Sequence, residues 1–456
     1  MSNKETICAI STAVGRGAIA IIRMSGEEAF NISEKLISLR NKKITHKHNS
    51  ISLGYFKKEN SLIDEVLVSS FKAPNSYTGE DMIEINCHGS NFIQQQILQQ
   101  LTAAGARMAS PGEFTLRAFL NNKLDLSQAE GVADLISSSS KASHDIAIRQ
   151  MRGGFSNEIS SLRGKLLEFS SLIELELDFN EEDVEFADRE KLMNLISEIQ
   201  EKVEYLISSF SLGNVIKNGI PVAIVGNTNV GKSTLLNLLV KDQKAIVSDI
   251  PGTTRDSIED IINIKGVTFR FIDTAGIRQS KDKIENIGID KTYENIKKAS
   301  IVIVLLEPTD DFEDIIRKVR QAKSEQTHVF LVANKIDIYD KEKLDNFFYD
   351  VKEDITYISA KYSTNTDLLI SKIISVVNLD QIENSNVIVS NVRHHDALQN
   401  TNEAIERIIA GVNSKLSGDF LAMDIREAIH YLGEITGEIT TDEILGNIFA
   451  SFCIGK

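Results

Sequence analysis

The spacing of apolar residues changes twice along the chain and divides it into regions of three kinds. Residues 1–120 contain short apolar runs, AIAIIRM, EVLVSSF and MIEINCHG, separated by Gly and polar turns, and one amphipathic stretch at 91–104. Short runs bounded by turn residues are typical of strands, whereas the stretch at 91–104 has helical spacing. The first 120 residues are therefore predicted to form an α+β domain.

The second region, residues 121–216, has a period of 3.6 that predicts amphipathic helices. Its apolar positions are Ile159, Leu162, Leu166, Phe169 and Ile173, followed by Leu192, Ile196, Ile199, Val203, Leu206 and Phe210. Helical spacing returns after residue 380, at 396–411, 420–433 and 441–451. Thr440 with Glu443 three residues later predicts a capping box for the last helix. The segments 121–216 and 380–456 are predicted to be two parts of one helical bundle domain.

The third region, residues 217–379, alternates apolar β-runs with helical segments. The runs are VAIVG (222–226), FRFIDTAG (269–276), IVIVLLE (301–307), VFLVANKID (329–337) and ITYISAK (355–361). Apolar strands separated by helices favour a mainly parallel, doubly wound sheet with right-handed crossovers. The fold class is therefore a multidomain α/β and α+β protein, in which an α/β domain is inserted into the helical domain.

Composition narrows the environment and the partners. The chain has 456 residues, 42% of them hydrophobic, and no apolar stretch approaches the ~18 residues that span a bilayer. Cys8, Cys87 and Cys453 are far apart and lack CxxC spacing, and Arg16 interrupts the only N-terminal apolar stretch. These features predict a cytoplasmic protein without a membrane anchor, a secretory signal or a zinc site. The net charge of −15 opposes tight binding of polyanions, so RNA is expected to be held largely by a partner.

A phosphate-binding loop is the clearest chemical motif. Residues 226–233, Gly-Asn-Thr-Asn-Val-Gly-Lys-Ser, match G-x-x-x-x-G-K-[ST] between a β-run and an amphipathic helix. Backbone N–H groups in such a loop turn onto phosphates at a positive helix end. Lys232 is predicted to reach the β- and γ-phosphates, and the Ser233 hydroxyl to bind Mg²⁺.

Three later segments predict that the nucleotide is GTP. Asp273-Thr-Ala-Gly276, Asn334-Lys-Ile-Asp337 and Ser359-Ala-Lys361 each follow a predicted strand, as expected of a binding crevice at strand ends. A carboxylate at Asp337 can accept two hydrogen bonds from guanine, a pattern that adenine does not offer. The segment at 359–361 is expected to donate a backbone N–H to guanine O6.

Hydrolysis requires a group that positions water. The residue after Gly276 is Ile277, which cannot take the role of the glutamine found there in Ras-like enzymes. Residues 248–256 can close over the γ-phosphate, with Thr254 as a candidate Mg²⁺ ligand, and Thr253 with Asn229 and nearby carbonyls suits a large monovalent cation. Glu285 is a candidate for orienting water. Asn229 as a loop-stabilising amide and Glu285 as a surface carboxylate are the alternatives.

Beyond these motifs, several blocks resemble the MnmE/TrmE family of tRNA-modification GTPases. They are AVGRGAIAIIRMSG (13–26), APNSYTGEDMIEINCHGS (73–90), PGEFTLRAFLNNKLDLSQAEGVADLI (111–136), NTNVGKSTLLN, DIPGTTRD, DTAGIR and the terminal CIGK. The resemblance covers essentially the whole chain, and the N-terminal and C-terminal blocks are not shared by GTPases generally. It implies a K⁺-stimulated GTPase with an N-terminal domain, residues 1–120, that binds a tetrahydrofolate derivative in its 5,10-methylene or 5-formyl form and forms a homodimer.

The resemblance further implies joint action with an FAD-dependent partner of the MnmG/GidA type. Together they add aminomethyl or carboxymethylaminomethyl groups to C5 of the wobble uridine of certain tRNAs, with a methylene-tetrahydrofolate as one-carbon donor.

The site residues that follow from the motifs and the resemblance fall into four groups. Those assigned to GTP are Asn229, Val230, Gly231, Lys232, Ser233, Thr234, Ser248, Asp249, Ile250, Pro251, Gly252, Thr253, Thr254, Asp273, Thr274, Ala275, Gly276, Asn334, Lys335, Ile336, Asp337, Ser359, Ala360 and Lys361. Those assigned to folate are Arg23, Glu84, Lys123 and Lys456. Those assigned to Mg²⁺ are Ser233 and Thr254, and those assigned to K⁺ are Asn229, Ser248, Ile250 and Thr253. The catalytic candidates are Lys232, Glu285 and Cys453.

One departure and two alternatives qualify this interpretation. Pro251 and Ser248 stand where many relatives have Ala and Thr, and Pro removes an N–H and fixes φ. An Era/Der-like ribosome-assembly GTPase is one alternative, although the C-terminal part lacks a basic RNA-binding appendage. A folate aminomethyltransferase with a regulatory GTPase domain is the other.

Overall fold

The structure is a computed structural model. It describes residues 5–39, 50–59, 61–178, 189–242, 260–272, 294–308, 312–324, 327–349, 351, 353–376, 387–414 and 416–455. The chain forms two compact units. One comprises residues 1–133, 150–189 and 407–456, and the other comprises residues 134–149 and 190–406.

The first unit is built on a mostly antiparallel sheet. Its strands are β1 (Ile7–Ile10), β2 (Ile19–Ser25), β3 (Ile37–Leu39), β4 (Ser50–Lys58), β5 (Ser61–Phe71), β6 (Met82–His88) and β7 (Arg107–Met108). Among the described residues they lie in the order β3-β4-β5-β6-β2-β1-β7. Alternate residues of β2 and β6, such as Ile22, Met24, Ile83 and Ile85, are buried, and the residues between them face the other side of the sheet.

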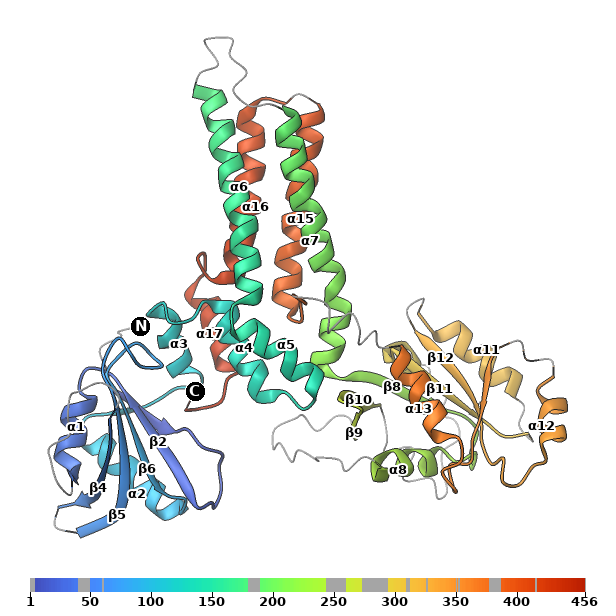
Figure 1. Ribbon diagram of the computed structural model, residues 1–456, viewed down its shortest axis with the longest axis horizontal. Helices are drawn as coiled ribbons and strands as arrows, with labels where there is room; N and C mark the ends of the chain where they lie inside the picture. Colours follow the sequence, from blue (N-terminus) through green and yellow to red (C-terminus); the bar gives the residue numbers. More distant parts are fainter. Residues whose placement is uncertain are drawn as a thin grey trace. The chain divides into compact units, whose positions relative to one another are not determined.

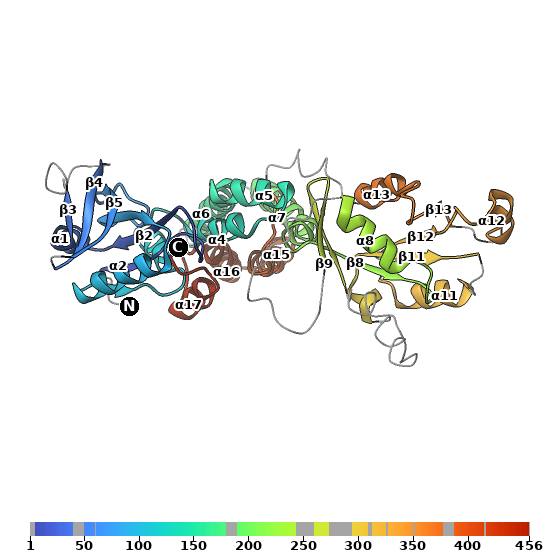
Figure 2. The same cartoon turned by 90° about the horizontal axis from the view of Figure 1, so that it is seen from below.

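Helices α1 (Ala29–Leu36) and α2 (Asn91–Ala103) cover the buried face of this sheet (Figures 1 and 2), where Phe30, Ile97 and Leu101 enter its core. The chain continues into α3 (Glu113–Leu120), α4 (Leu126–Ser137), α5 (Lys141–Met151) and the long α6 (Gly154–Asp178). Helix α6 packs against α16 (Gly418–Thr436), and all five apolar positions predicted for it are buried. The predicted α+β fold at the N-terminus and the predicted amphipathic helices are therefore confirmed.

The last helix of this unit corrects one prediction. Helix α17 runs over Asp442–Ala450, and its N-cap is Thr441, whose hydroxyl accepts a hydrogen bond from Ile444 N at 3.3 Å. The capping pattern predicted at Thr440 is therefore wrong by one residue. Thr441 has the extended backbone of an N-cap, with φ −114° and ψ 155°, so the first helical residue is Asp442.

The second unit holds a mainly parallel sheet of β8 (Ile220–Val225), β9 (Asp260–Ile264), β10 (Val267–Phe271), β11 (Ile301–Leu306), β12 (His328–Ala333) and β13 (Ile355–Tyr357). Among the described residues the order is β13-β12-β11-β8-β10-β9, with only β9 antiparallel to its neighbour. The predicted doubly wound sheet is confirmed. The edge strand β9 is not apparent from the sequence pattern.

Helices lie on both faces of this sheet. Helices α8 (Lys232–Asp242) and α13 (Thr366–Ser375) lie on one face and α11 (Phe312–Ala322) on the other (Figure 2). Leu235, Leu236 and Leu239 of α8 are buried in one core, whereas Ile316 and Val319 of α11 belong to the core on the opposite face. A further helix, α12 (Lys341–Phe347), precedes β13.

Two long helices precede and follow this sheet in sequence, α7 (Arg189–Asn218) and α15 (Val392–Asn413). Phe210 of α7 and His395 of α15 stack with their ring centroids 4.2 Å apart. Ile196, Ile199, Val203 and Leu206 of α7 are buried, as their spacing predicts. In the described part of the chain, no helix combines the length and the apolar character needed to cross a membrane.

Candidate nucleotide-binding site

The phosphate loop connects the central strand β8 to α8. Gly226 (φ 154°), Asn229 (φ 65°) and Gly231 (φ 106°) give the loop backbone angles that favour glycine, and this lets its N–H groups turn inward. The Lys232 ammonium donates to Gly226 O and to Asn227 O, both at 2.7 Å. The cation therefore lies within the curve of the loop, as required for contact with a phosphate.

Asn334 connects this loop to the two segments expected to bind the base. Its Nδ2 donates to Val230 O at 2.8 Å, and its Oδ1 accepts from Ala360 N at 3.0 Å. All three residues are almost fully buried. A Cβ added to Gly231 would lie 2.3 Å from Asn334 Nδ2, so a larger residue at 231 would displace this amide. The three segments predicted to form the site are thus brought together at the ends of β8, β12 and β13.

The Ser359 side chain holds Asp337, although only a backbone N–H of the segment 359–361 was predicted to take part in the site. The Ser359 hydroxyl donates to Asp337 Oδ1 at 2.6 Å, while Ser359 itself is buried and Asp337 is exposed. Ser359 also pairs with Thr364 through both backbone groups, which fixes the turn after β13. The backbone N–H of Ala360 donates to Asn334 Oδ1. The predicted hydrogen bond from the segment 359–361 to guanine O6 stays a prediction. The Asp337 carboxylate is therefore exposed and oriented at the end of β12.

Glu307 and Tyr339 belong to this site although the sequence motifs do not single them out. Glu307 follows β11, and its carboxylate accepts from Lys335 Nζ at 2.5 Å and from the Tyr339 hydroxyl at 2.9 Å. The signal available in the sequence was only position, since Glu307 is the first residue after a buried strand of a sheet whose carboxyl edge carries the site.

Several predicted site residues lie outside the described residues. For the nucleotide and the two cations these are Ser248, Asp249, Ile250, Pro251, Gly252, Thr253, Thr254, Asp273, Thr274, Ala275 and Gly276, together with Glu285 and the folate candidate Lys456. Their roles remain predictions. Within the described residues, Asn229, Lys232, Ser233 and Thr234 lie at the loop and the first turn of α8.

Two of the folate candidates form a pair on the first sheet. Arg23 of β2 and Glu84 of β6 are register partners, with Arg23 Nη2 2.8 Å from Glu84 Oε1, and their side chains are 20% and 18% exposed. The Arg23 guanidinium lies 5.2 Å from the ring centroid of Tyr77 and 5.6 Å from that of Phe114. Burial raises the pKa of Tyr77 above its usual value, although its bond to Thr115 and the charge of Arg23 act against this. The pair is a polar site with aromatic walls.

Lys123 and Cys453 are the other candidate residues of the first unit that the structure describes. Lys123 is exposed, and its Nζ donates to Pro74 O at 3.0 Å. Cys453 is exposed, and its carbonyl accepts from Gly112 N at 3.3 Å, close to the start of α3. Ser11 Oγ donates to Gly455 O at 2.9 Å, so the C-terminal tail is fixed at the end of β1.

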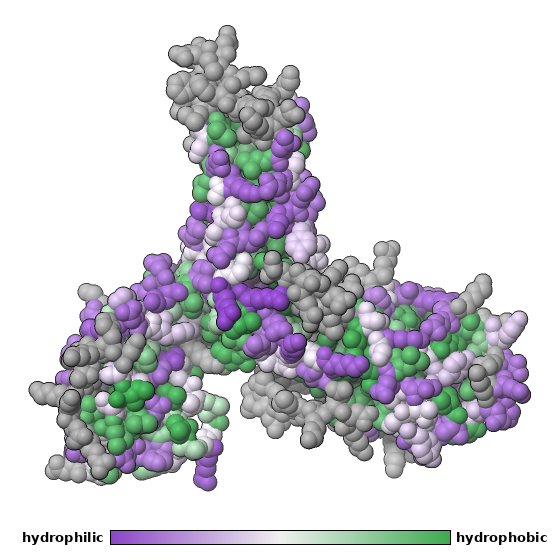
Figure 3. Space-filling model, viewed as in Figure 1, coloured by the Kyte–Doolittle hydropathy of each residue, from purple (hydrophilic) through white to green (hydrophobic). Residues whose placement is uncertain are grey.

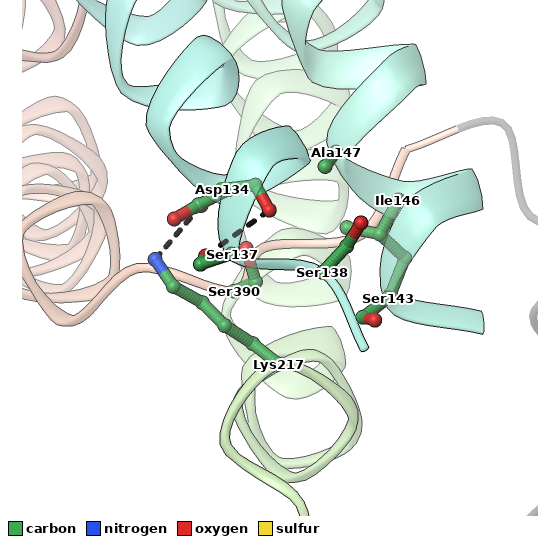
Figure 4. A pocket seen from close by; sticks show the side chains of 8 residues that line it. All are labelled: Asp134, Ser137, Ser138, Ser143, Ile146, Ala147, Lys217 and Ser390. Atoms are coloured by element: carbon green, nitrogen blue, oxygen red, sulfur yellow. Dashed lines mark hydrogen bonds and ion pairs between the residues drawn. The ribbon is translucent and has the colours of Figure 1, made fainter. Parts of the chain in front are cut away.

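A small pocket in the second unit offers no alternative site. It is lined by residues of α4, α5 and α7 and by Ser390 (Figure 4), and Asp134 and Lys217 form an ion pair of 2.8 Å across it. The cavity has a volume of about 20 Å³, which holds about one water molecule. It is too small for a nucleotide or a folate.

Two protein-family models together match almost the whole chain. The family described as "GTP-binding protein TrmE N-terminus" matches residues 6–123, and the family described as "MnmE helical domain" matches residues 126–453. Among solved structures, Era in complex with MgGDPNP and 16S ribosomal RNA covers 40% of this chain and 65% of its own, at 24% identity and a TM-score of 0.27. A likeness this weak supports no conclusion.

Relatives named "tRNA modification GTPase MnmE" match the chain along its full length. The protein of Flavobacterium johnsoniae is 52% identical and that of Bacteroides fragilis 50%, each alignment covering 100% of both chains. The protein of Cytophaga hutchinsonii is 48% identical over 100% of this chain and 98% of its own. With this identity along the whole length and both family matches, the chain belongs to the MnmE (TrmE) family.

Proposed function

We propose that this protein is a GTPase that acts in tRNA modification. The relatives that match along the whole chain are named for this activity. The observation that carries the proposal is the double hydrogen bond of Asn334, which joins the phosphate loop at Val230 to the turn at Ala360. A phosphate-binding loop and a base-binding segment held at one sheet edge form a site for a nucleotide.

Guanine is the base that this arrangement favours. The Asp337 carboxylate is exposed and already oriented by Ser359, so it can accept two hydrogen bonds from guanine N1–H and the exocyclic amine. A base without those donors cannot form these hydrogen bonds to a charged group, each of which is worth about 1.5–3 kcal/mol. The proposed site therefore discriminates against adenine through Asp337.

Two cations complete the proposal for hydrolysis. Ser233 in the first turn of α8 offers a hydroxyl next to Lys232, which fits Mg²⁺ bound beside the β- and γ-phosphates. Asn229, with its positive φ, offers an amide oxygen to K⁺ from the loop itself. When bound, the two cations offset negative charge that develops on the phosphates. Thr254, Ser248, Ile250, Thr253 and Glu285 are the further residues proposed for these roles.

A tetrahydrofolate derivative is the proposed one-carbon carrier of the first unit. Arg23 and Glu84 present a donor and an acceptor side by side between the rings of Tyr77 and Phe114. A flat heterocycle with a polar edge can pair with such groups and stack on the rings. Lys123 is proposed to bind a carboxylate of the glutamate tail, with Lys456 and Cys453 contributing from the C-terminal tail.

The protein is proposed to act as a homodimer through the open face of its first sheet. Ile19, Ile51, Leu53 and Leu67 are 65%, 73%, 37% and 47% exposed there. Figure 3 shows apolar side chains gathered over these strands. Leu53 and Leu67 are register partners on neighbouring strands, so the apolar surface is continuous. A second copy covering it would remove this surface from water, which is the usual reason for such a patch.

An FAD-dependent protein of the MnmG/GidA type is the proposed partner, with FAD bound only to that partner. The net charge of −15 supports a division of labour in which the partner holds most of the tRNA. Together they are proposed to add an aminomethyl or carboxymethylaminomethyl group to C5 of the wobble uridine in the cytoplasm.

Nucleotide turnover tests the first part of the proposal. We expect the full chain to hydrolyse GTP but not ATP, faster in K⁺ than in Na⁺, and Asn229→Ala to remove the difference between the salts. Asp337→Asn should lose GTP turnover and gain turnover of xanthosine triphosphate, because the amide matches the altered base edge. Equal hydrolysis of GTP and ATP by the unaltered chain would refute the proposed site.

The role in tRNA modification requires a cellular test. Deletion of the gene should remove the modified wobble uridines from total tRNA, measured by nucleoside mass spectrometry, and the wild-type gene should restore them. Restoration by Asp337→Asn would show that guanine recognition is not needed. Unchanged wobble uridines after deletion would exclude the role itself.

A further inference from the structure

Glu307 holds both ends of the segment that presents Asp337. Its Oε2 is 2.5 Å from Lys335 Nζ, and its Oε1 accepts from the Tyr339 hydroxyl at 2.9 Å. Lys335 and Tyr339 lie two residues before and two residues after Asp337. One carboxylate directly after β11 thus holds the loop after β12 on either side of the residue proposed to bind the base.

The sheet explains why this carboxylate lies at the site. Strands β11 and β12 are parallel, with Leu306 opposite Ala333 as the last register pair. Glu307 and Asn334 therefore leave neighbouring strands at the same edge. Pro308 follows Glu307 and restricts the backbone before it, which favours an extended exit from the strand.

Lys335 has an unfavourable backbone conformation, which its contact with Glu307 helps to hold. Its φ is 67°, a value that non-glycine residues adopt at a cost of about 1–3 kcal/mol unless their surroundings hold them. The Lys335 and Glu307 side chains are only 27% and 15% exposed, so salt and water screen their attraction less than that of a fully exposed ion pair. The carboxylate thus fixes the Lys335 side chain before a nucleotide arrives.

We propose that Glu307, assisted by Tyr339, is a positioning residue for guanine-nucleotide binding, which holds Lys335 and so orients Asp337. The proposal rests on the proposed GTPase function and deepens it. Glu307 does not itself contact the base in this proposal. It acts through Lys335, which lies two residues before Asp337, and it places the Asp337 carboxylate where both guanine donors can reach it.

The test compares dissociation of a ribose-labelled fluorescent GDP from the full chain and its variants. Glu307→Gln keeps the shape of the side chain and removes its charge, and we expect GDP to dissociate about tenfold faster, as for loss of one charged hydrogen bond. Tyr339→Phe removes a single hydroxyl and should accelerate release by about two- to fivefold.

Asp354→Asn is the control, matched at the lysine. Asp354 pairs with Lys372 at 2.6 Å, and that lysine is 27% exposed like Lys335, whereas Asp354 is 81% exposed and Glu307 15%. The pair lies at the start of β13, away from the carboxyl edge. This variant should release GDP at the wild-type rate. Faster release in Asp354→Asn, equal to that in Glu307→Gln, would overturn the proposal, because the effect would then belong to ion pairs of this sheet in general.

A double-mutant cycle separates positioning from mere stability. If Glu307 acts through Lys335, Glu307→Gln should add less than twofold to the release rate of Lys335→Ala. Fully additive effects would overturn the proposal, and so would release from Glu307→Gln within twofold of wild type. Guanine selectivity is the second readout. Inosine diphosphate lacks the exocyclic amine of GDP, and Glu307→Gln should reduce the preference of the protein for GDP over inosine diphosphate. Failure of the unaltered chain to bind GDP would instead refute the proposed function.

Discussion

Asn334 Nδ2 donates to Val230 O at 2.8 Å, across 104 residues of sequence, and this bond makes two separate motifs one site. We predict that Asn334→Ala destabilises the second unit by about 1–3 kcal/mol, because the buried Val230 carbonyl and Ala360 N–H lose their partner. The affinity for GDP should fall as well. Urea unfolding followed by circular dichroism and a titration with GDP measure the two effects.

The control for Asn334→Ala is Asn218→Ala. Asn218 is exposed and donates to Asn214 Oδ1 within α7, so its removal should change stability by no more than about 0.5 kcal/mol. Equal losses in the two variants would contradict the role given to Asn334.

Gly231→Ala should damage the same contact from the other side. Gly231 has φ 106°, and a Cβ there would lie 2.3 Å from Asn334 Nδ2, so the loop or the amide must shift. We expect a loss of about 1–3 kcal/mol in stability and a marked loss of GTP binding. Gly164→Ala is the matched control, since Gly164 lies in α6 with no atom within 4 Å of its added Cβ. It should gain about 0.5–1 kcal/mol, and a gain of that size at Gly231 would contradict the strained geometry.

The sequence predicted the place of the site but not the bonds that close it. Strand ends of a parallel sheet meet at one edge, so the loop at 226–233 and the segments at 334–337 and 359–361 were expected to converge. Which donor meets which acceptor depends on side-chain directions that no spacing rule gives. Glu307 therefore went unnoticed, because a glutamate after a strand is common and its partners are set by the register of β11 and β12.

One strand, one helix boundary and one side-chain pairing were not predicted from the sequence. Strand β9 was missed because its run DIINI is short and exposes Ile261 while Ile262 and Ile264 are buried. Thr440 and Thr441 are both suitable N-caps in sequence, and only the backbone angles at 441 decide between them. The predicted pair Arg23 and Glu84 was expected to contact a ligand, and their bond to each other follows from strand register.

The first unit should lose stability in acid through Glu113. Burial alone raises the pKa of Glu113, but hydrogen bonds from Arg107, from Ser110 N and from Arg117 outweigh it, so the pKa lies below its usual value. A lowered pKa stabilises the fold above the ordinary carboxyl pKa, about 4.3, and the stabilisation is lost as pH falls through the folded-state value.

Glu113→Gln tests this dependence. We expect urea midpoints of the wild type to fall between about pH 5 and pH 3, and to fall less steeply in the variant, because the variant has no carboxylate to protonate at that position. The variant should be less stable near pH 7, where the wild type keeps the charged bonds to Arg107 and Arg117. Parallel pH profiles for the two proteins would contradict the assignment.

Thiol reactivity should distinguish Cys453 from the other two cysteines. Burial raises the pKa of Cys8 to about 11, and burial with the charge of Asp64 raises that of Cys87 to about 11. Only the thiolate reacts, so both are protected at pH 8 by protonation as well as by burial, whereas Cys453 is exposed. A chromogenic disulfide reagent should therefore modify one thiol per native chain and three in urea. Cys453→Ser should abolish the native reaction and leave two thiols after unfolding, and rapid native labelling of Cys8 or Cys87 would show that the first sheet opens far more readily than its buried core implies.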